Sequence, residues 1–423
     1  MDRTPSASAY YDACSQERAE RANGLKTHAM ARLRFLTSGE SHGPGLTVIL
    51  EGLPFGLPLN SSHIDPDLAR RQGGYGRGGR MQIERDQATI RSGVRHGRTL
   101  GSPVTILIEN RDWANWRDKM SVDPVDGEIP AITKPRPGHA DLAGMVKYGT
   151  DDLRNILERS SARETTARVA AGAVAKRLLS EATIQIRSRT VRIGPIDDTP
   201  DLNPLRPDEW PWDDIEASPV RAATPSRAAA MIQEIDAARE AGSTLGGIFE
   251  VVAWGLPIGL GSHVHWDRKL DGRLAQAILS INAVKGVELG TAFENTSRPG
   301  HKVHDAISHT HQDGWTRLTN RAGGTEGGMT NGQPLVVRGA LKPIATMRTP
   351  LPTVDVQTHE HTKAHFERSD ICVVPAAGVI GEAMVALVLA DALMETFGGD
   401  NINDIVSAVC RRREGSHPTS ASA

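Results

Sequence analysis

Two Gly-His turns contain residues that could transfer protons. Ser41 and His42 lie in GESHGPG, between two strand-like stretches, and His139 lies in RPGHAD beside Arg136. A structural turn needs only Gly, Asn or Asp, so a serine and a histidine at a turn indicate chemistry. Histidine titrates near neutral pH, which makes both histidines candidate proton donors. Taken alone, His139 also fits a solvent-exposed or capping role.

A Gly-rich segment, ARRQGGYGRGGR (69–80), places arginines around Tyr75. Glycine lets the backbone approach a ligand closely, and guanidinium groups bind phosphate and carboxylate with two hydrogen bonds. We therefore expect Arg71, Arg77 and Arg80 to bind an anionic small molecule. An RNA-binding Arg-Gly box and a plain basic surface loop are the alternatives. Such boxes usually lie in long low-complexity tails, whereas this one is a single copy between ordered elements.

Two later segments offer a cofactor site and a base. ERSSARETTARVAAGAV (158–174) sets Ser160, Ser161 and Arg163 among small residues, which either admit a cofactor phosphate or merely pack one helix against another. In FERSDICVVPAAGVIGEAM (366–384), Asp370 precedes a long apolar run. A carboxylate in such surroundings can have a raised pKa and serve as a base. A surface ion pair between Arg368 and Asp370 is the alternative.

Two loops do not have the residue spacing of known metal-binding or nucleotide-binding motifs. HKVHDAISHTHQDG (301–314) has four histidines, but their spacing matches neither a zincin nor a zinc finger and no cysteine is near. We therefore expect no metal. NRAGGTEGGMTNGQPL (320–335) lacks both the GxGxxG spacing after a strand and the GKS/T of a P-loop.

The composition is that of a soluble globular protein. Of 423 residues, 39% are hydrophobic and 24% charged, and the net charge of −2 provides no overall field that would attract nucleic acid or a membrane. Cys14, Cys372 and Cys410 share no CxxC spacing, which favours a reducing compartment, and we expect a cytoplasmic protein. The longest apolar stretch, EAMVALVLADALM (382–394), is too short to span a bilayer and predicts a buried helix.

Helix and strand patterns are interleaved without regular βα alternation, which favours an α+β fold. DPDLARRQ (65–72) predicts a short helix with Asp65 as N-cap and Pro66 at its first position. Residues 151–182 predict a helix with a break at the serine pair. Further helices are expected at 224–242 and 267–281, strands at 81–94, 246–257 and 332–344, and the most linker-like stretch at 193–222.

The two ends of the chain are polar and aperiodic. Residues 1–29 lack the apolar core of a signal peptide, and Met30 is a candidate start of the folded protein. The last residues, RRREGSHPTSASA, resemble a tail. We expect a disordered extension at 1–29, a single catalytic domain at 30–412 and a disordered tail at 413–423.

Taken together, the motifs resemble those of the chorismate synthase family. GESHGPGLTVILEGLP, ERSSARETTARVAAGAV and RSDICVVPAAGVIGEAM are similar to its three signature segments, in that order. RRQGGYGRGGRM, RPGHAD, GGTEGGMTNGQPL and LKPIATM match further segments, so the resemblance runs from about Met30 to about Cys410. The departures are mild: Ile371 follows the aspartate where many members carry Pro or Val, and Asn282 stands where Gln is also common.

The resemblance implies a fold, a reaction and an assembly. The fold is a single-domain β-α-β sandwich, and the assembly is a homotetramer. The reaction is a 1,4-anti elimination of phosphate from 5-enolpyruvylshikimate 3-phosphate, which yields chorismate with reduced FMN and no net oxidation. Either NADPH acting on this chain or an external flavin reductase would keep the FMN reduced. No nucleic acid or membrane partner is implied.

The resemblance also implies roles for individual residues. His42, with Ser41 beside it, would protonate or hold the reduced flavin, and His139 would stabilise the departing phosphate. Asp370 would take a proton from flavin N5. The positions that match flavin contacts are Arg159, Ser160, Ser161, Asn282, Ala283, Gly327, Lys342, Pro343, Ile344, Ala345, Thr346 and Arg368. The positions expected at substrate or NADPH are Ser41, Arg71, Arg77, Arg80, Arg136 and Arg163.

Two other function classes compete with this interpretation. A flavin-dependent oxidoreductase would use the same cofactor but consume one NADPH per product. An RNA-binding protein built on the Arg-Gly segment would bind nucleic acid with a steep salt dependence. Neither alternative accounts for both histidines and the Arg-Ser-Asp segment.

Overall fold

A four-stranded antiparallel sheet forms one layer of the chain. The computed structural model describes residues 33–78, 85–310, 314–367 and 369–416, and residues from Leu33 onward form one compact unit. The strand order is β1 (Arg34–Ser38), β2 (Gly45–Glu51), β6 (Val104–Glu109) and β3 (Thr89–Ser92). Apolar residues alternate along β2 and β6, and Val48 lies opposite Ile106, with both side chains fully buried. The alternation therefore gives this sheet one core-facing side.

A second, five-stranded antiparallel sheet forms another layer. Its order is β10 (Val284–Leu289), β15 (Leu335–Leu341), β9 (Gly247–Trp254), β7 (Gln185–Ile193) and β8 (Ile196–Asp197). Smaller pairs are β4 (Val94–Arg95) with β5 (Arg98–Thr99), β11 (Ile307–Thr310) with β12 (Gly314–Arg317), β13 (Thr325–Glu326) with β14 (Met329–Thr330), and β16 (Pro352–Val354) with β17 (His361–Lys363). With the helices described next, these sheets make the fold α+β, as the sequence predicts.

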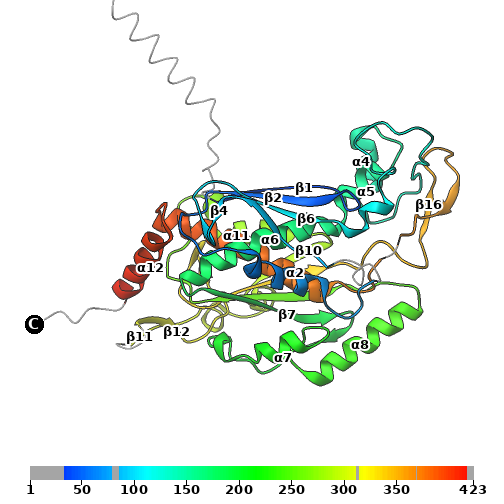
Figure 1. Cartoon of the computed structure of the whole chain (residues 1–423). Helices are drawn as coiled ribbons and strands as arrows, with labels where there is room; N and C mark the ends of the chain where they lie inside the picture. Colours follow the sequence, from blue (N-terminus) through cyan, green and yellow to red (C-terminus); the bar gives the residue numbers. More distant parts are fainter. Residues whose placement is uncertain (1–32, 79–84, 311–313, 368, 417–423) are drawn as a thin grey trace, which may run out of the picture. The chain divides into compact units, whose positions relative to one another are not determined.

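Two long helices lie between the sheets (Figure 1). Helix α6 (Thr165–Glu181) packs on β2, helix α11 (Val374–Phe397) packs on β7 and β9, and the two helices pack on each other. They approach so closely that a Cβ on Gly172 would lie 2.2 Å from Ala383 Cβ. The α6 part of the small-residue run at 158–174 therefore packs one helix against another, which was one of the two interpretations of that run.

The remaining helices pack around these layers. They are α2 (Asp65–Gln72), α4 (Asp141–Tyr148), α5 (Arg154–Ser160), α7 (Trp212–Ala217), α8 (Pro225–Glu240), α9 (Leu270–Leu279), α10 (Ala292–Asn295) and α12 (Ile402–Ser416). Helix α2 packs against both α6 and α11, and α9 packs against α11. The break expected at the serine pair is confirmed: α5 ends at Ser160, and Ser161 is extended and caps the short turn before α6. Helix α8 begins at Pro225, and the left-handed Gly242 follows its end, as predicted.

Helix α11 passes the length and composition test for a membrane span, alone among the helices of the described ranges. In its most apolar 18-residue window, however, 94% of the residues are buried inside the structure. This burial is that of a core helix, which confirms the buried helix expected at 382–394.

A buried ion cluster joins α2 to both core helices. Glu382 of α11 accepts hydrogen bonds from Arg70 (2.7 Å) and Lys176 (2.8 Å), and Arg70 also donates to Asp67 and Glu216. Burial alone would raise the pKa of Glu382, but these cations hold it well below its usual range. Arg70 of the Arg-Gly segment therefore has a structural partner, and its neighbour Arg71 is held at a fixed place.

The sequence-based expectations for 65–94 need two corrections. Asp65 is the first residue of α2 and not its cap, because its carboxylate accepts from Ala88 N (2.8 Å) while Ile64 precedes the helix. Within the described part of the strand expected at 81–94, Thr89–Ser92 forms β3 and Val94 begins the separate strand β4. Before β3, Asp86 N donates to Gln72 Oε1 and not to a neighbouring strand, and 81–84 lie outside the described residues.

Two further expectations are wrong. The linker-like stretch 193–222 is folded, because Trp210 and Trp212 stack on each other and Trp212 stacks on Trp254 of β9 (ring centroids 5.8 Å apart). The disordered tail is expected from residue 413, but α12 continues to Ser416, so residues 413–416 are helical. The remaining tail residues, 417–423, and the extension 1–29 lie outside the described part of the chain.

Candidate active site

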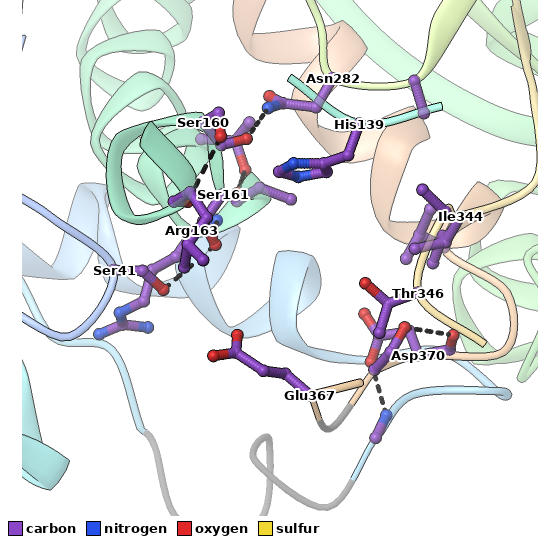
Figure 2. A pocket seen from close by; sticks show the side chains of 18 of the residues that line it. Ser41, His139, Ser160, Ser161, Arg163, Asn282, Ile344, Thr346, Glu367 and Asp370 are labelled. Carbon is purple, nitrogen blue, oxygen red and sulfur yellow. Dashed lines mark hydrogen bonds between the residues drawn. The ribbon is translucent and has the colours of Figure 1, made fainter. Parts of the chain in front are cut away.

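One cavity of about 690 Å³ brings the separate motifs together. It is lined from the turn after β1, the Arg-Gly segment, the RPGHAD turn, the α5–α6 junction, the turn before β10, the segment after β15 and the start of α11. Figure 2 shows Ser41, Ser160 and Ser161 on one side of this space and Ile344, Thr346 and Asp370 on the other. His139 points between them.

His42 is held by a buried carboxylate. Glu158 of α5 lies 2.9 and 3.0 Å from Nδ1 of His42 through its two oxygens, and it also accepts from the His42 backbone N at 2.8 Å. The indole of Trp116 stacks on the imidazole, with ring centroids 3.7 Å apart and 22° between the planes. The Glu158 side chain is only 3% exposed and also accepts from Arg154, so its oxygens face Nδ1 of His42 as hydrogen-bond acceptors. Nδ1 of His42 therefore carries a proton.

His139 has the same kind of partner. Its Nδ1 lies 2.5 Å from Oδ1 of Asp141, a residue that is 1% exposed. Arg136 donates to the other Asp141 oxygen at 2.8 Å and to Thr346 Oγ1 at 3.1 Å. Burial alone would raise the pKa of Asp141, but the hydrogen bonds from His139 and Arg136 hold it well below its usual range. An ionised Asp141 fixes the Nδ1–H tautomer and leaves Nε2 of His139 as its second exchangeable site.

Asp370 is held at the start of the apolar run by the Arg-Gly segment. Arg77 Nη1 lies 2.9 Å from one carboxylate oxygen, and Gly78 N donates to the other at 2.5 Å. A bulkier residue at Gly78 would crowd this contact, since a Cβ there would lie 3.0 Å from Ser369 O. The sequence suggested an apolar environment for Asp370, but the carboxylate in fact faces a cation. Arg368, the partner of Asp370 in the alternative interpretation, lies outside the described residues.

Two arginines share one buried carboxylate at the back of the cavity. Asp86, 6% exposed, lies 3.2 Å from Arg163 Nη2 and 3.7 Å from Arg71 Nη1. Arg71 also donates to Thr165 Oγ1 and to the Ala162 carbonyl. Burial lowers the pKa of Arg71 to about 10, so this guanidinium remains charged at neutral pH. Together with Arg77 and Arg136, these side chains make the cavity attractive to anions.

The cofactor-type segments form the rest of the lining. Ser160, Ser161, Asn282, Ala283 and the whole run Lys342–Thr346 line the cavity. Asn282 Nδ2 donates to the Ser160 carbonyl at 3.0 Å, whereas its buried Oδ1 accepts no hydrogen bond from any described residue. Ala283 has a positive φ of 68°, a conformation that a residue with a side chain rarely adopts. The segment thus presents an unsatisfied acceptor and strained backbone toward a ligand.

Of the described residues that the sequence predicted for the site, Arg159 and Gly327 do not line the cavity. Arg159 points toward β1 and donates to Thr37 O (2.9 Å) and Gly39 O (3.0 Å), because successive residues of a helix face different directions. Gly327 lies in the β13–β14 turn, next to Gly328, whose carbonyl accepts from Leu270 N. Leu270 is the first residue of α9, whereas Asn282 follows the last residue of that helix. Arg80 and Arg368 lie outside the described residues.

Several residues of this site were missed from the sequence. They are Asp86, Asp112, Trp116, Asp141, Glu158 and Glu367. Glu158 and Asp141 stand inside segments that the sequence singled out, ERSSARET and RPGHAD, so carboxylates in the same motif as a histidine were the available signal. Trp116 and Asp86 lie in segments without such a motif and had no comparable signal.

The chain is similar to known proteins over most of its length. The profile of the family described as chorismate synthase matches residues 33–394. A chorismate synthase from Geobacillus sp. (strain WCH70) is 54% identical over 384 residues, covering 90% of this chain and 98% of the relative. One from Streptomyces avermitilis is 55% identical over 381 residues, covering 88% and 96%. A crystal structure of chorismate synthase matches with a TM-score of 0.74 and 43% identity, covering 91% and 98%.

The similarity and the cavity lead to the same assignment. The family performs the 1,4-anti elimination that converts 5-enolpyruvylshikimate 3-phosphate to chorismate and phosphate, in the shikimate pathway to aromatic amino acids, and it requires a reduced flavin. The motifs from which the sequence predicted this chemistry line one cavity. The chain therefore belongs to the chorismate synthase family and is a carbon–oxygen lyase acting on a small-molecule phosphate.

Proposed function

We propose that the 690 Å³ cavity is where this elimination takes place, with His42, His139 and Asp370 as its catalytic residues and FMN as its flavin. The observation that supports this proposal best is that all three residues line one cavity although they belong to three distant segments. Each has a fixed charged partner: Glu158, Asp141 and Arg77, respectively.

The arginines of the cavity fit an anionic substrate. The substrate carries two carboxylates and one phosphate, and Arg71, Arg77, Arg136 and Arg163 line the cavity. Buried guanidinium groups bind such anions more strongly than exposed ones, because little water competes. Ser41, only 3% exposed and 3.1 Å from Ser161 through the two hydroxyl oxygens, lies in the same wall.

The residues present also fit a flavin. The buried Oδ1 of Asn282 needs a donor, and a flavin ring offers an N–H. We assign Ser160, Ser161, Asn282, Ala283 and the run Lys342–Thr346 to the flavin. Arg159 and Gly327 do not line the cavity of this chain, so we do not assign them to the flavin. A bound reduced flavin supplies an electron-rich ring that lends charge transiently to the leaving phosphate.

Each of the three catalytic side chains would hold or transfer a proton at one particular atom. His139 donates from Nε2 to the departing phosphate, because Asp141 holds the other ring nitrogen. His42 holds or donates a proton at the flavin through Nε2, since Glu158 holds its Nδ1. Asp370 would accept a proton at its carboxylate, which Arg77 and Gly78 orient.

An anaerobic assay tests the function directly. Purified protein, FMN reduced with dithionite and 5-enolpyruvylshikimate 3-phosphate should yield chorismate and phosphate in equal amounts. A second arm replaces dithionite with NADPH: turnover there would show that the chain reduces its own flavin, and its absence would point to an external reductase. Consumption of one NADPH per product would instead support the oxidoreductase alternative. No chorismate in the dithionite arm would contradict the proposal.

We further propose the β-α-β sandwich, the homotetramer and the cytoplasmic location. Helices α6 and α11 between the two sheets support the sandwich. Leu36 and Ile49 lie directly opposite each other on β1 and β2 with 70% and 40% of their surface exposed, which suits a contact with another copy. Light scattering should give four times the chain mass of 45.5 kDa. Cys372 and Cys410, the cysteines of the described ranges, are free, as in a reducing compartment.

A further inference from the structure

We propose that Glu158 is the positioning residue of His42: it holds the imidazole with Nδ1–H toward α5 and places a negative charge against the ring. This inference rests on the role of His42 proposed above, and it adds a residue that the sequence did not identify.

Both carboxylate oxygens of Glu158 contact His42. One oxygen lies 2.9 Å from Nδ1, and the other lies 3.0 Å from Nδ1 and 2.8 Å from the His42 backbone N. The Glu158 carbonyl also accepts from Ser41 N at 3.0 Å. The same residue therefore fixes both the turn that presents His42 and the plane of its ring. A hydrogen-bonded carboxylate selects one imidazole tautomer in this way.

Charges around His42 act in both directions. Glu158 and Glu367 place negative charge near the ring, whereas Arg154, which donates to Glu158 at 2.9 Å, places positive charge there. Asp112 lines the same cavity, Lys119 lies over the Trp116 ring, and His365 pairs with Glu367. Both carboxylate oxygens of Glu158 lie at hydrogen-bond distance from the His42 ring, so the Glu158 charge acts on the ring at close range.

Trp116 provides a readout that needs neither flavin nor turnover. Its indole stacks on the His42 ring at 3.7 Å. A protonated imidazole quenches a stacked indole more strongly than a neutral one does. The chain has seven tryptophans, so the Trp116 signal is obtained as the difference between the unaltered protein and Trp116→Phe. His42→Asn should remove the pH dependence of that difference.

The experiment measures this difference signal against pH in flavin-free protein. Glu158→Gln keeps the size of the side chain but removes its charge, so the midpoint of the transition should fall by on the order of one pH unit. Glu158→Asp keeps the charge at a longer distance and should shift the midpoint less. Arg154→Gln removes a cation and should shift it upward. Glu181→Gln, a half-buried α6 residue paired with Arg177, is the matched control and should leave the midpoint unchanged.

Two results would overturn the proposal: a Glu158→Gln midpoint equal to that of the unaltered protein, or a transition that persists in His42→Asn. If Glu158→Gln fails to fold, the shifts in Glu158→Asp and Arg154→Gln must still have opposite signs, and equal signs would refute the idea. Turnover is assayed separately and should fall roughly tenfold to a hundredfold in Glu158→Gln. Full turnover in His42→Asn would refute the proposed catalytic role of His42 and leave the fluorescence result intact.

Discussion

Arg77 Nη1 lies 2.9 Å from Asp370 Oδ2, and Gly78 N donates to the other oxygen of the same carboxylate. An arginine expected to hold substrate and an aspartate expected to act as a base are therefore partners. The two contacts orient the Asp370 carboxylate. They also place the Arg-Gly segment beside the residues that lead into α11.

Asp370→Asn should separate catalysis from structure. The Asn carbonyl can still accept from Gly78 N, but the side chain can no longer take a proton. FMN and substrate should bind, while turnover per bound FMN falls by about 10²–10⁴-fold, as expected for a lost general base. The measurement is anaerobic turnover divided by bound FMN. A ratio near that of the unaltered protein would show that Asp370 is not the proton acceptor.

Arg77→Ala should weaken substrate binding. The change removes a charge-assisted contact worth roughly 1.5–3 kcal/mol and leaves the Asp370 carboxylate without its cation. The dissociation constant of the substrate, measured by calorimetry on the FMN-free protein, should rise by one to two orders of magnitude. Arg206→Ala, at an exposed surface pair, is the control. Equal substrate affinity in the folded Arg77→Ala protein would exclude the role.

Asp141→Asn should lower stability in a pH-dependent way. The pKa of Asp141 is held below its usual range, so its ionised form contributes stability at every pH above the unfolded value of about 3.9. That contribution is lost as the pH falls through the lower folded pKa. The melting temperature of the variant should therefore be reduced at pH 7, and the difference from the unaltered protein should shrink below about pH 4. A constant difference down to pH 2.5 would contradict the linkage.

Gly172→Ala should destabilise the helix crossing at the centre of the fold. A Cβ at Gly172 would lie 2.2 Å from Ala383 Cβ, so α6 and α11 would have to move apart. Such overpacking costs about 1–3 kcal/mol of unfolding free energy, measurable by urea denaturation. Gly272→Ala in α9 is the matched control, because a Cβ there meets its nearest atom at 3.9 Å. The control should be neutral or stabilising; equal losses in both variants would argue against the crossing.

Removal of residues 1–29 should leave activity and melting temperature unchanged. The segment has no apolar periodicity to bury, and the family profile begins only at residue 33. Thermal unfolding of the truncated and full-length proteins, side by side, checks this expectation. A large drop in melting temperature on truncation would show that the segment packs on the folded unit.

Local signals in the sequence predicted most of the secondary structure. The break at Ser161, the start of α8 at Pro225 and its end before Gly242 depend on backbone preferences of a few adjacent residues. The stretch 193–222 was misjudged for the opposite reason. Trp212 of this stretch stacks on Trp254 of β9 and Trp210 stacks on Trp212, contacts that composition cannot reveal.

The sequence by itself determined the candidate catalytic residues, because long motifs keep His42, His139 and Asp370 in recognisable surroundings. Only the tertiary structure decided their partners. Arg70 and Arg71 are adjacent, yet the first joins the ion cluster around Glu382 and the second lines the cavity. The direction of each side chain depends on how α2 packs against α6 and α11. Partners of this kind are fixed by packing between distant segments, which local sequence does not encode.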